Sequence, residues 1–171
     1  MLQGMLALSG FAQPVSEYQV KAAFLYNFAK FVEWPPETFK SERSPLRICL
    51  LGRDPFAGSL NAAVAGKTAT GRSLELVDVS DARHADGCQI LFVSSPERKN
   101  LRSSIAELPG IGILTVGESE GFASNGGIIN FKLEDGRVRL EINVEAAGHA
   151  GLRISSKVLN VAEIIKLSVK K

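Results

Sequence analysis

Hydrophobic residues recur every three or four positions along the first well-defined segment of the chain: they are Val20, Phe24, Phe28 and Phe31. The charged residues Lys21, Lys30 and Glu33 fall off this stripe. Such a period predicts an amphipathic helix over residues 17–33 with an aromatic face. An aromatic stripe at this spacing is typical of a helix that packs on a core. The alternative is a dimer or partner surface that uses Phe24 and Phe28.

Both ends of this helix carry local signals. Ser16 and Gln19 have the spacing of a capping box, in which each side chain accepts a hydrogen bond from the other residue's backbone. Pro35 and Pro36 disfavour helical backbone in the residues before them, so the helix is expected to stop by Trp34.

Short apolar segments then alternate with helical ones. Strands are expected at residues 46–51, 74–79, 88–93 and 113–116, and helices at residues 55–64, 97–108 and 118–123. Apolar strands separated by helices predict a largely parallel sheet that is covered on both faces.

The pattern changes after residue 126. Residues 127–133 and 137–143 flank the turn residues Glu134, Asp135 and Gly136, which predicts a β-hairpin. In its second strand, apolar Val138, Leu140 and Ile142 alternate with Arg137, Arg139 and Glu141. One face should therefore contact solvent or a partner. A final helix over residues 156–167 closes a single α/β domain that spans residues 13–171.

Residues 1–12, MLQGMLALSGFA, differ from the rest of the chain. Residues 5–8 are apolar and residues 10–12 have the small-x-small form of a signal-peptidase site, but no basic segment precedes them. We interpret residues 1–12 as a truncated signal peptide, with a frayed apolar end as the alternative. No apolar run approaches the roughly 18 residues of a membrane span.

Charge and composition exclude one class of function. The formal net charge is +2, and acidic and basic residues are interspersed without the basic stripe of a nucleic-acid-binding protein. We therefore expect no nucleic-acid partner.

Recognisable catalytic motifs are absent from the sequence. Gly66-Lys67-Thr68 ends like a phosphate-binding loop, but Asn61 stands where its leading glycine belongs. Asp81 and Asp86 flank His84, but one histidine among loop carboxylates is a weak metal signal. A serine triad would need His84 or His149, and no nucleophile elbow exists for it. We expect no enzyme activity, no cofactor and no metal site.

Cys49 and Cys88 are the only cysteines. An exported protein permits a disulfide between them, and two buried thiols that never meet are the alternative. The sequence pattern alone leaves both open.

Ordered motifs across the chain resemble the YfiR-like family of periplasmic regulators. They are YQVKAAFLYNFAKFVEWP at residues 18–35, ICLLGRDPF at 48–56, GK at 66–67, GR at 71–72, CQILFV at 88–93, LTVG at 114–117, GGIINF at 126–131, EIN at 141–143 and GLRISSKVL at 151–159. The first block and GGIINF together are specific to the family.

This resemblance implies a periplasmic α/β protein that dimerises and restrains a membrane-anchored diguanylate cyclase. It further implies that release of that restraint, under redox or envelope stress, raises cyclic di-GMP and promotes biofilm. Small-molecule ligands, nucleotide-like or aromatic, and peptidoglycan are further partners that the resemblance implies.

Individual residues match family positions. Cys49 and Cys88 match a cysteine pair that can form a disulfide, Arg153 matches a basic ligand-binding position, and Glu141 lies in a stretch linked with envelope contacts. The chain departs from the pattern in two respects: it has no second cysteine pair near residues 123–130, and Ser155 stands where a histidine assists ligand binding.

Two functions from different classes follow from these observations. The first is a regulatory protein that binds the periplasmic domain of a cyclase. The second is a stand-alone periplasmic small-molecule-binding protein in which Arg53 and Arg153 flank an anionic or aromatic ligand. An enzyme of unfamiliar type is a third, weaker alternative.

Overall fold

The structure, a computed structural model, describes residues 14–94 and 101–166. In chain order its helices and strands are α1 (Glu17–Phe31), β1 (Val32–Glu33), η1 (Pro36–Thr38), β2 (Leu46–Leu51), α2 (Ser59–Val64), β3 (Thr68–Ala69), β4 (Arg72–Val79), η2 (Ala82–His84), β5 (Ile90–Val93), α3 (Leu101–Ala106), β6 (Leu114–Gly117), η4 (Ala123–Asn125), β7 (Ile129–Glu134), β8 (Arg137–Ile142), α4 (Val144–His149), β9 (Arg153–Ile154), α5 (Ser156–Leu159) and β10 (Ala162–Ile164).

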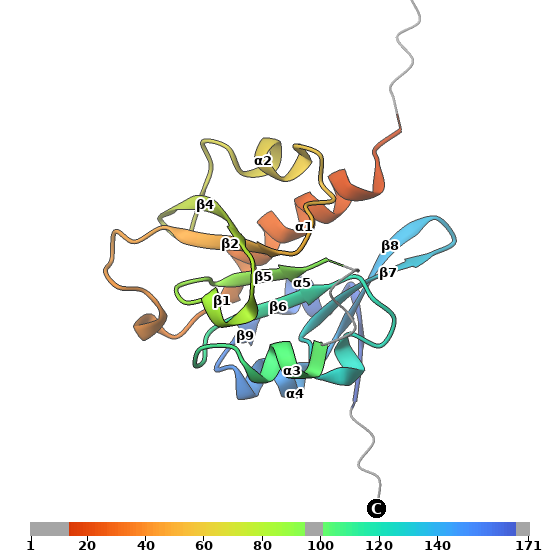
Figure 1. Ribbon diagram of the computed structural model, residues 1–171. Helices are drawn as coiled ribbons and strands as arrows, with labels where there is room; N and C mark the ends of the chain where they lie inside the picture. The colour runs from red at the N-terminus through yellow and green to blue at the C-terminus, as the bar shows by residue number, and fades with distance from the viewer. Residues whose placement is uncertain (1–13, 95–100, 167–171) are drawn as a thin grey trace, which may run out of the picture.

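An eight-stranded sheet crosses the molecule in the order β10-β8-β7-β6-β5-β2-β4-β3 (Figure 1). Its middle strands β7, β6, β5, β2 and β4 are parallel neighbours. At one side β8 runs antiparallel to β7, and β10 then runs parallel to β8. This arrangement confirms the predicted single α/β domain with a mostly parallel sheet and a hairpin towards the C-terminal end.

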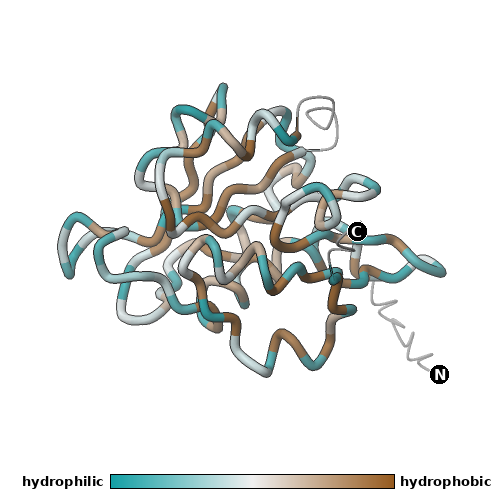
Figure 2. Tube along the Cα trace, turned by 90° about the horizontal axis from the view of Figure 1, so that it is seen from below, coloured by the Kyte–Doolittle hydropathy of each residue, from teal (hydrophilic) through white to brown (hydrophobic). Residues whose placement is uncertain are grey.

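Successive residues of each central strand pack into two different cores. Ile48 and Leu50 of β2 face the cluster that holds α1 and α2, whereas Cys49 and Leu51 face the cluster that holds α3. This alternation follows from the two-residue period of a strand. Figure 2 shows hydrophobic residues along these strands and hydrophilic residues at the outer loops.

The first helix has the predicted capping box but a different buried face. The Ser16 side chain accepts a hydrogen bond from the Gln19 backbone, and Gln19 accepts one from Ser16. The buried residues are Lys21, Ala22, Leu25, Phe28 and Ala29. The expectation that Lys21 lies off the core stripe is therefore wrong, and an ion pair described below explains its burial.

The hairpin formed by β7 and β8 has the predicted turn. Asp135 and Gly136 both have positive φ, at 50° and 73°. Two consecutive residues of this kind match the twist of the flanking strands, which favours Asp-Gly at the turn. Leu140 and Ile142 of β8 are buried and Arg139 is exposed, as the alternation predicts.

The predicted final helix over residues 156–167 is wrong. Helix α5 ends at Leu159, and the chain then forms β10, which pairs with β8 from Ala162 to Ile164. Without β10, the outer backbone groups of β8 would lack partners, and an unpaired strand edge is unfavourable. Strand pairing with the edge of β8 therefore outweighs the local helical pattern of the segment after Leu159.

Other helix boundaries differ more modestly. Helix α2 begins only at Ser59, because Gly58 has a φ of 87° that interrupts the helical backbone. The helix predicted at 118–123 is a turn followed by η4. Part of the helix predicted at 97–108, and the interpretation of residues 1–12, lie outside the described residues. No helix in the described ranges is both long and apolar enough to cross a membrane.

Candidate functional site

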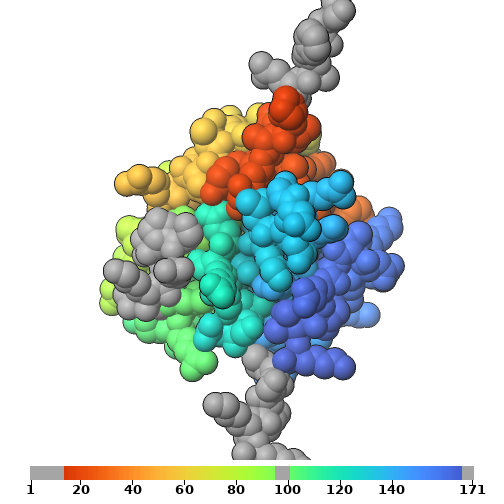
Figure 3. Space-filling model, turned by 90° about the vertical axis from the view of Figure 1, so that its right-hand side faces the viewer, coloured from red at the N-terminus to blue at the C-terminus, as the bar shows by residue number. Residues whose placement is uncertain are grey.

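A groove of about 240 Å³ lies between α1, β8 and α5. Its lining residues are Phe24, Asn27, Phe28, Phe31, Leu140, Lys157, Val158 and Val161, and we call it the aromatic groove. Figure 3 shows α1, the β7–β8 hairpin and the C-terminal segment next to one another on one side of the molecule. The groove therefore joins the aromatic helix and the hairpin, the two features that the sequence pattern singled out as candidate surfaces.

The aromatic stripe of α1 divides between the core and this groove. Phe28 is completely buried, and its ring centroid lies 6.1 Å from those of both Phe24 and Phe131. Phe24 and Phe31 are only partly buried and border the groove. Phe28 thus belongs to the core, whereas Phe24 presents apolar surface at the groove edge.

Positive charge surrounds the C-terminal half of α1. The Lys157 Nζ lies 5.0 Å from the centroid of the Phe31 ring, and the Lys30 Nζ lies 5.2 Å from the same ring. Lys30 and Lys67 also lie 4.6 Å and 4.8 Å from the Tyr26 ring. An ammonium group this close to a ring is attracted by the negative face of the ring. The groove edge therefore suits a partner with apolar and acidic side chains.

Two apolar residues of the C-terminal segment are exposed, and one of them, Val161, lines the groove. Val161 is 62% exposed and Ile164 is 39% exposed. Ile164 belongs to β10, which has only β8 as a neighbour among the described strands. The outer edge of β10 can therefore accept a further strand.

Glu141 lies on the other face of β8 from Leu140. Its Oε2 accepts a hydrogen bond of 2.8 Å from the Asn130 Nδ2, and its Oε1 lies 3.8 Å from the Lys132 Nζ. The carboxylate therefore pairs within the hairpin and does not line the aromatic groove. A role in envelope contacts stays a prediction.

The two candidate ligand-binding arginines lie at opposite ends of the parallel strands. Arg153 is in β9, where it pairs with Glu33 of β1, and its Nε lies 3.9 Å from the Glu33 Oε2. The adjoining Trp34 donates a hydrogen bond to the Gln89 backbone, just before β5 begins. Arg53 instead follows the carboxyl end of β2.

These positions do not place Arg53 and Arg153 against one ligand. Ligand binding at Arg53 and ligand binding at Arg153 therefore stay two separate predictions. Arg53 lies where β2 has β4 on one side and β5 on the other. Ligands of open α/β sheets bind outside the carboxyl ends of the strands at such a point.

Cys49 and Cys88 form a disulfide in the structure, with their Cα atoms 6.0 Å apart. Cys49 lies in β2, and Cys88 precedes β5, the parallel neighbour of β2. Both residues are buried. The tertiary structure thus decides between the bridged and separate cysteines that the sequence pattern left open. No group of three or more potential metal ligands occurs in the part of the chain that the structure describes.

A buried ion pair lies at the other end of α1 from the lysines of the groove. The Lys21 Nζ lies 2.7 Å from the Glu118 Oε2, and it also contacts the Glu17 carboxylate. The side chains of Lys21 and Glu118 are each only 5% exposed. The Lys21 Nζ also lies 4.5 Å from the Tyr18 ring centroid. This cluster ties the helix to the loop that follows β6.

Sequence reasoning missed this cluster because Lys21 and Glu118 are 97 positions apart. Burial by itself lowers the pKa of Lys21, but hydrogen bonds to Glu118 and Glu17 and the negative charges of both carboxylates together outweigh it, so the pKa is raised. Burial, followed by the negative charge of Glu118, raises the pKa of Tyr18.

We expect the free energy of unfolding to fall as the pH rises above about 10, near the usual pKa values of tyrosine and lysine. Both Tyr18 and Lys21 have a higher pKa in the folded state. Their contribution is therefore complete below the unfolded pKa values and is lost as the pH rises through the folded ones. Urea unfolding at about pH 8 and about pH 11 measures the loss.

The matched control for this pH dependence is Tyr18→Phe combined with Lys21→Met. Neither replacement titrates, so the double variant should lose less stability than the parent protein over the same pH interval. Equal losses in the two proteins would contradict the prediction.

Residues 18–163 match the sequence model of a family described as YfiR/HmsC-like. A solved structure of a conserved domain protein from Vibrio cholerae O1 biovar El Tor strain N16961 is 13% identical, with a TM-score of 0.54. The match covers 88% of this chain and 60% of that chain. At this identity the likeness concerns the fold alone.

A second solved structure, the ABC domain in complex with L-Trp from Streptococcus pneumoniae, is 14% identical with a TM-score of 0.45. That match covers 70% of this chain and 55% of the other. The chain thus corresponds to less than two thirds of either solved chain. No curated protein matches the sequence.

Proposed function

Because the chain belongs to the YfiR/HmsC-like family, we propose that it is a periplasmic regulatory protein that restrains a membrane-anchored diguanylate cyclase. The family match over residues 18–163 carries this proposal. It agrees with the resemblance that the ordered motifs indicated. In this proposal the protein acts by binding the periplasmic domain of the cyclase, and it catalyses no reaction.

The aromatic groove is the surface that we assign to the cyclase. It combines partly buried rings, exposed Val161 and the charge of Lys157. An apolar side chain of the cyclase would enter the groove, and acidic residues beside it would meet Lys157 and Lys30. Such a centre of aromatic and apolar groups with a charged rim is typical of protein interfaces.

The disulfide is consistent with a periplasmic location. Disulfides form and persist in oxidising compartments such as the periplasm and are rare in the cytosol. The bridge between Cys49 and Cys88 therefore supports export, and redox control through it stays a prediction.

We expect Val161→Asp to weaken binding to the cyclase's periplasmic domain at least tenfold, about the loss of 1.4 kcal/mol. Val161 is exposed, so the change should leave the melting temperature nearly unaltered. Phe24 is less suitable as a probe because it also packs on Phe28 and Phe131. Titration calorimetry with the purified cyclase domain measures the affinity, and intracellular cyclic di-GMP should rise in cells that carry the variant.

The matched control is Ile111→Asp. Ile111 is similarly apolar and 53% exposed, but it lies in the loop before β6 and does not line the groove. The Ile111→Asp variant should bind the cyclase domain with the same affinity as the parent protein. If both variants bind normally, the groove is not the cyclase site, and if the parent protein binds no cyclase domain, the proposed function is wrong.

Further features of the proposal follow from the family resemblance. They are a homodimer, a small-molecule ligand at Arg153, and peptidoglycan contact near Glu141. A ligand at Arg53 is proposed instead from its position after the carboxyl end of β2. A stand-alone small-molecule-binding protein remains the alternative function.

A further inference from the structure

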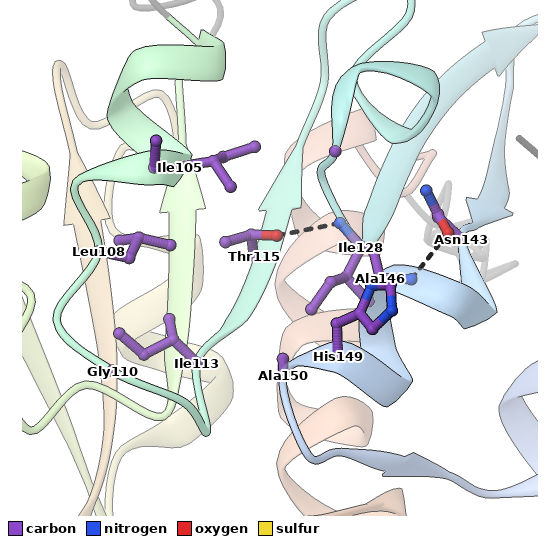
Figure 4. Close-up of a pocket in the computed structure, with 12 residues that line it drawn as sticks. Ile105, Leu108, Gly110, Ile113, Thr115, Ile128, Asn143, Ala146, His149 and Ala150 are labelled. Carbon is purple, nitrogen blue, oxygen red and sulfur yellow. Dashed lines mark hydrogen bonds between the residues drawn. The ribbon is translucent and has the colours of Figure 1, made fainter.

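A second, larger cavity lies between α3 and α4, with a volume of about 440 Å³ (Figure 4). Ile105 of α3 and Leu108 form one wall, and Ala146 of α4 and its C-cap residue Ala150 form the other. Thr115 of β6 lies at the floor between them. Small-molecule sites in proteins usually enclose about 300–1,000 Å³, so the cavity has the size of such a site.

The sequence of α4 keeps this space open. Ala146 and Ala150 lie four positions apart, so they occupy the same side of the helix and face the cavity. Neither side chain extends beyond a methyl group, so the wall leaves a gap that larger residues would fill. The opposite wall has bulky side chains, including Ile105 and Ile113, which make the lining mainly apolar.

Thr115 is the polar group at the floor. It is 2% exposed, and its neighbours Leu114 and Val116 point into the core on the other side of the sheet. The Thr115 Oγ1 accepts a hydrogen bond of 3.0 Å from the Ile128 backbone N–H. Within the described residues its own hydroxyl proton has no acceptor. A hydroxyl has one donor and two acceptor sites, so Thr115 can donate to a molecule in the cavity.

Other polar groups at the cavity restrict the choice of ligand. The Asn143 side chain already makes two hydrogen bonds within the protein: its Oδ1 accepts from the Ala146 N–H and its Nδ2 donates to the Ala123 carbonyl, each at 2.9 Å. The described lining contains no lysine, arginine, aspartate or glutamate, and His149 is its only titratable group. A charged ligand would lose hydration there without a lysine, arginine or carboxylate to pair with, which is costly.

We propose that this cavity binds a small, uncharged and largely apolar molecule that has one hydrogen-bond acceptor. The apolar walls contact its hydrocarbon part, and the Thr115 hydroxyl donates to its carbonyl or ether oxygen. This inference goes beyond the proposed regulation of a cyclase and does not depend on it. The cavity is also separate from the aromatic groove, since the two share no lining residue.

Prodan is a suitable probe because it is an uncharged naphthalene dye with a ketone, and its emission shifts to the blue in an apolar site. We expect saturable binding of prodan to the full chain. Ala150→Leu should weaken it at least about tenfold, because the added side chain occupies the cavity. Thr115→Val should weaken it about fivefold, the effect of one hydrogen bond. Loss of that bond should also shift the bound dye's emission further to the blue.

Two protein controls separate this site from other apolar surfaces and from general damage. Val161→Ser alters the aromatic groove and should leave prodan binding unchanged. Thr115→Ser keeps the hydroxyl and should retain affinity within about twofold. Thermal melts of all variants check that the fold is intact, which matters because Thr115→Val also removes the acceptor of the Ile128 N–H.

Anilinonaphthalene sulfonate supplies the ligand control, because it has a similar ring system and a negative charge. It should bind at least about tenfold more weakly than prodan, since the described lining has no lysine or arginine to pair with its sulfonate. The proposal is overturned if prodan does not bind saturably, if folded Ala150→Leu binds it normally, or if the anionic dye binds as tightly.

Discussion

Removal of the Cys49–Cys88 bridge is expected to lower the free energy of unfolding by about 4 kcal/mol. The two cysteines are 39 positions apart, and cross-linking a loop of this length restricts the unfolded chain by about that amount. The bridge also joins β2 to the residues just before its parallel neighbour β5, and the pairing of these strands otherwise depends on bringing distant segments together. The loss should therefore come mainly from a more flexible unfolded state.

Urea unfolding of the oxidised protein, the reduced protein and the Cys49→Ala/Cys88→Ala variant measures this effect. The reduced protein isolates the cross-link from the packing of the side chains, because it keeps both sulfur atoms. If reduction left the stability unchanged, the bridge would not restrict the unfolded chain as proposed. Binding of the cyclase domain to reduced protein that is still folded then tests redox control separately from stability.

Lys21→Met is expected to lower the free energy of unfolding by about 3–5 kcal/mol, the usual cost of removing one partner of a buried ion pair. The variant keeps a side chain of similar length over Tyr18 and Phe131, so the apolar packing is largely preserved. The Glu118 carboxylate, however, would remain buried without its cation. The desolvation of this unpaired carboxylate, more than the lost attraction between the two charges, accounts for the lower free energy of unfolding.

A second replacement tests this explanation. Lys21→Met combined with Glu118→Leu should recover most of the lost stability, because no uncompensated charge then remains in the protein. Lys30→Met, at a partly exposed position of the same helix, should cost less than about 1 kcal/mol. If the double variant were no more stable than Lys21→Met, the cost would arise from packing and not from the buried carboxylate.

Several elements could be predicted because their signals are local. The capping box at Ser16 and Gln19 needs residues three positions apart, and the hairpin turn needs only Asp135 and Gly136. The strand at residues 46–51 coincides with β2, since an apolar run of that length suits a strand buried on both faces. Short-range patterns of this kind depend little on the rest of the chain.

Predictions that depended on distant partners were less complete. The stripe of α1 was expected to centre on the phenylalanines, yet the buried face includes Lys21, because Glu118 supplies a counter-charge from the loop after β6. The segment after Leu159 was expected to be helical, yet it pairs with β8. In both cases a tertiary contact outweighs the local preference of the residues.

The sequence by itself determined the fold class, the start of the first helix, the hairpin and the family, because each depends on periodicity, turn chemistry or ordered motifs. Only the tertiary structure decided that Cys49 meets Cys88, that Arg53 and Arg153 lie apart, and that a cavity opens over Thr115. These features depend on which segments the sheet brings together. Contacts between residues tens of positions apart arise from the packing of whole elements, and no local pattern specifies them.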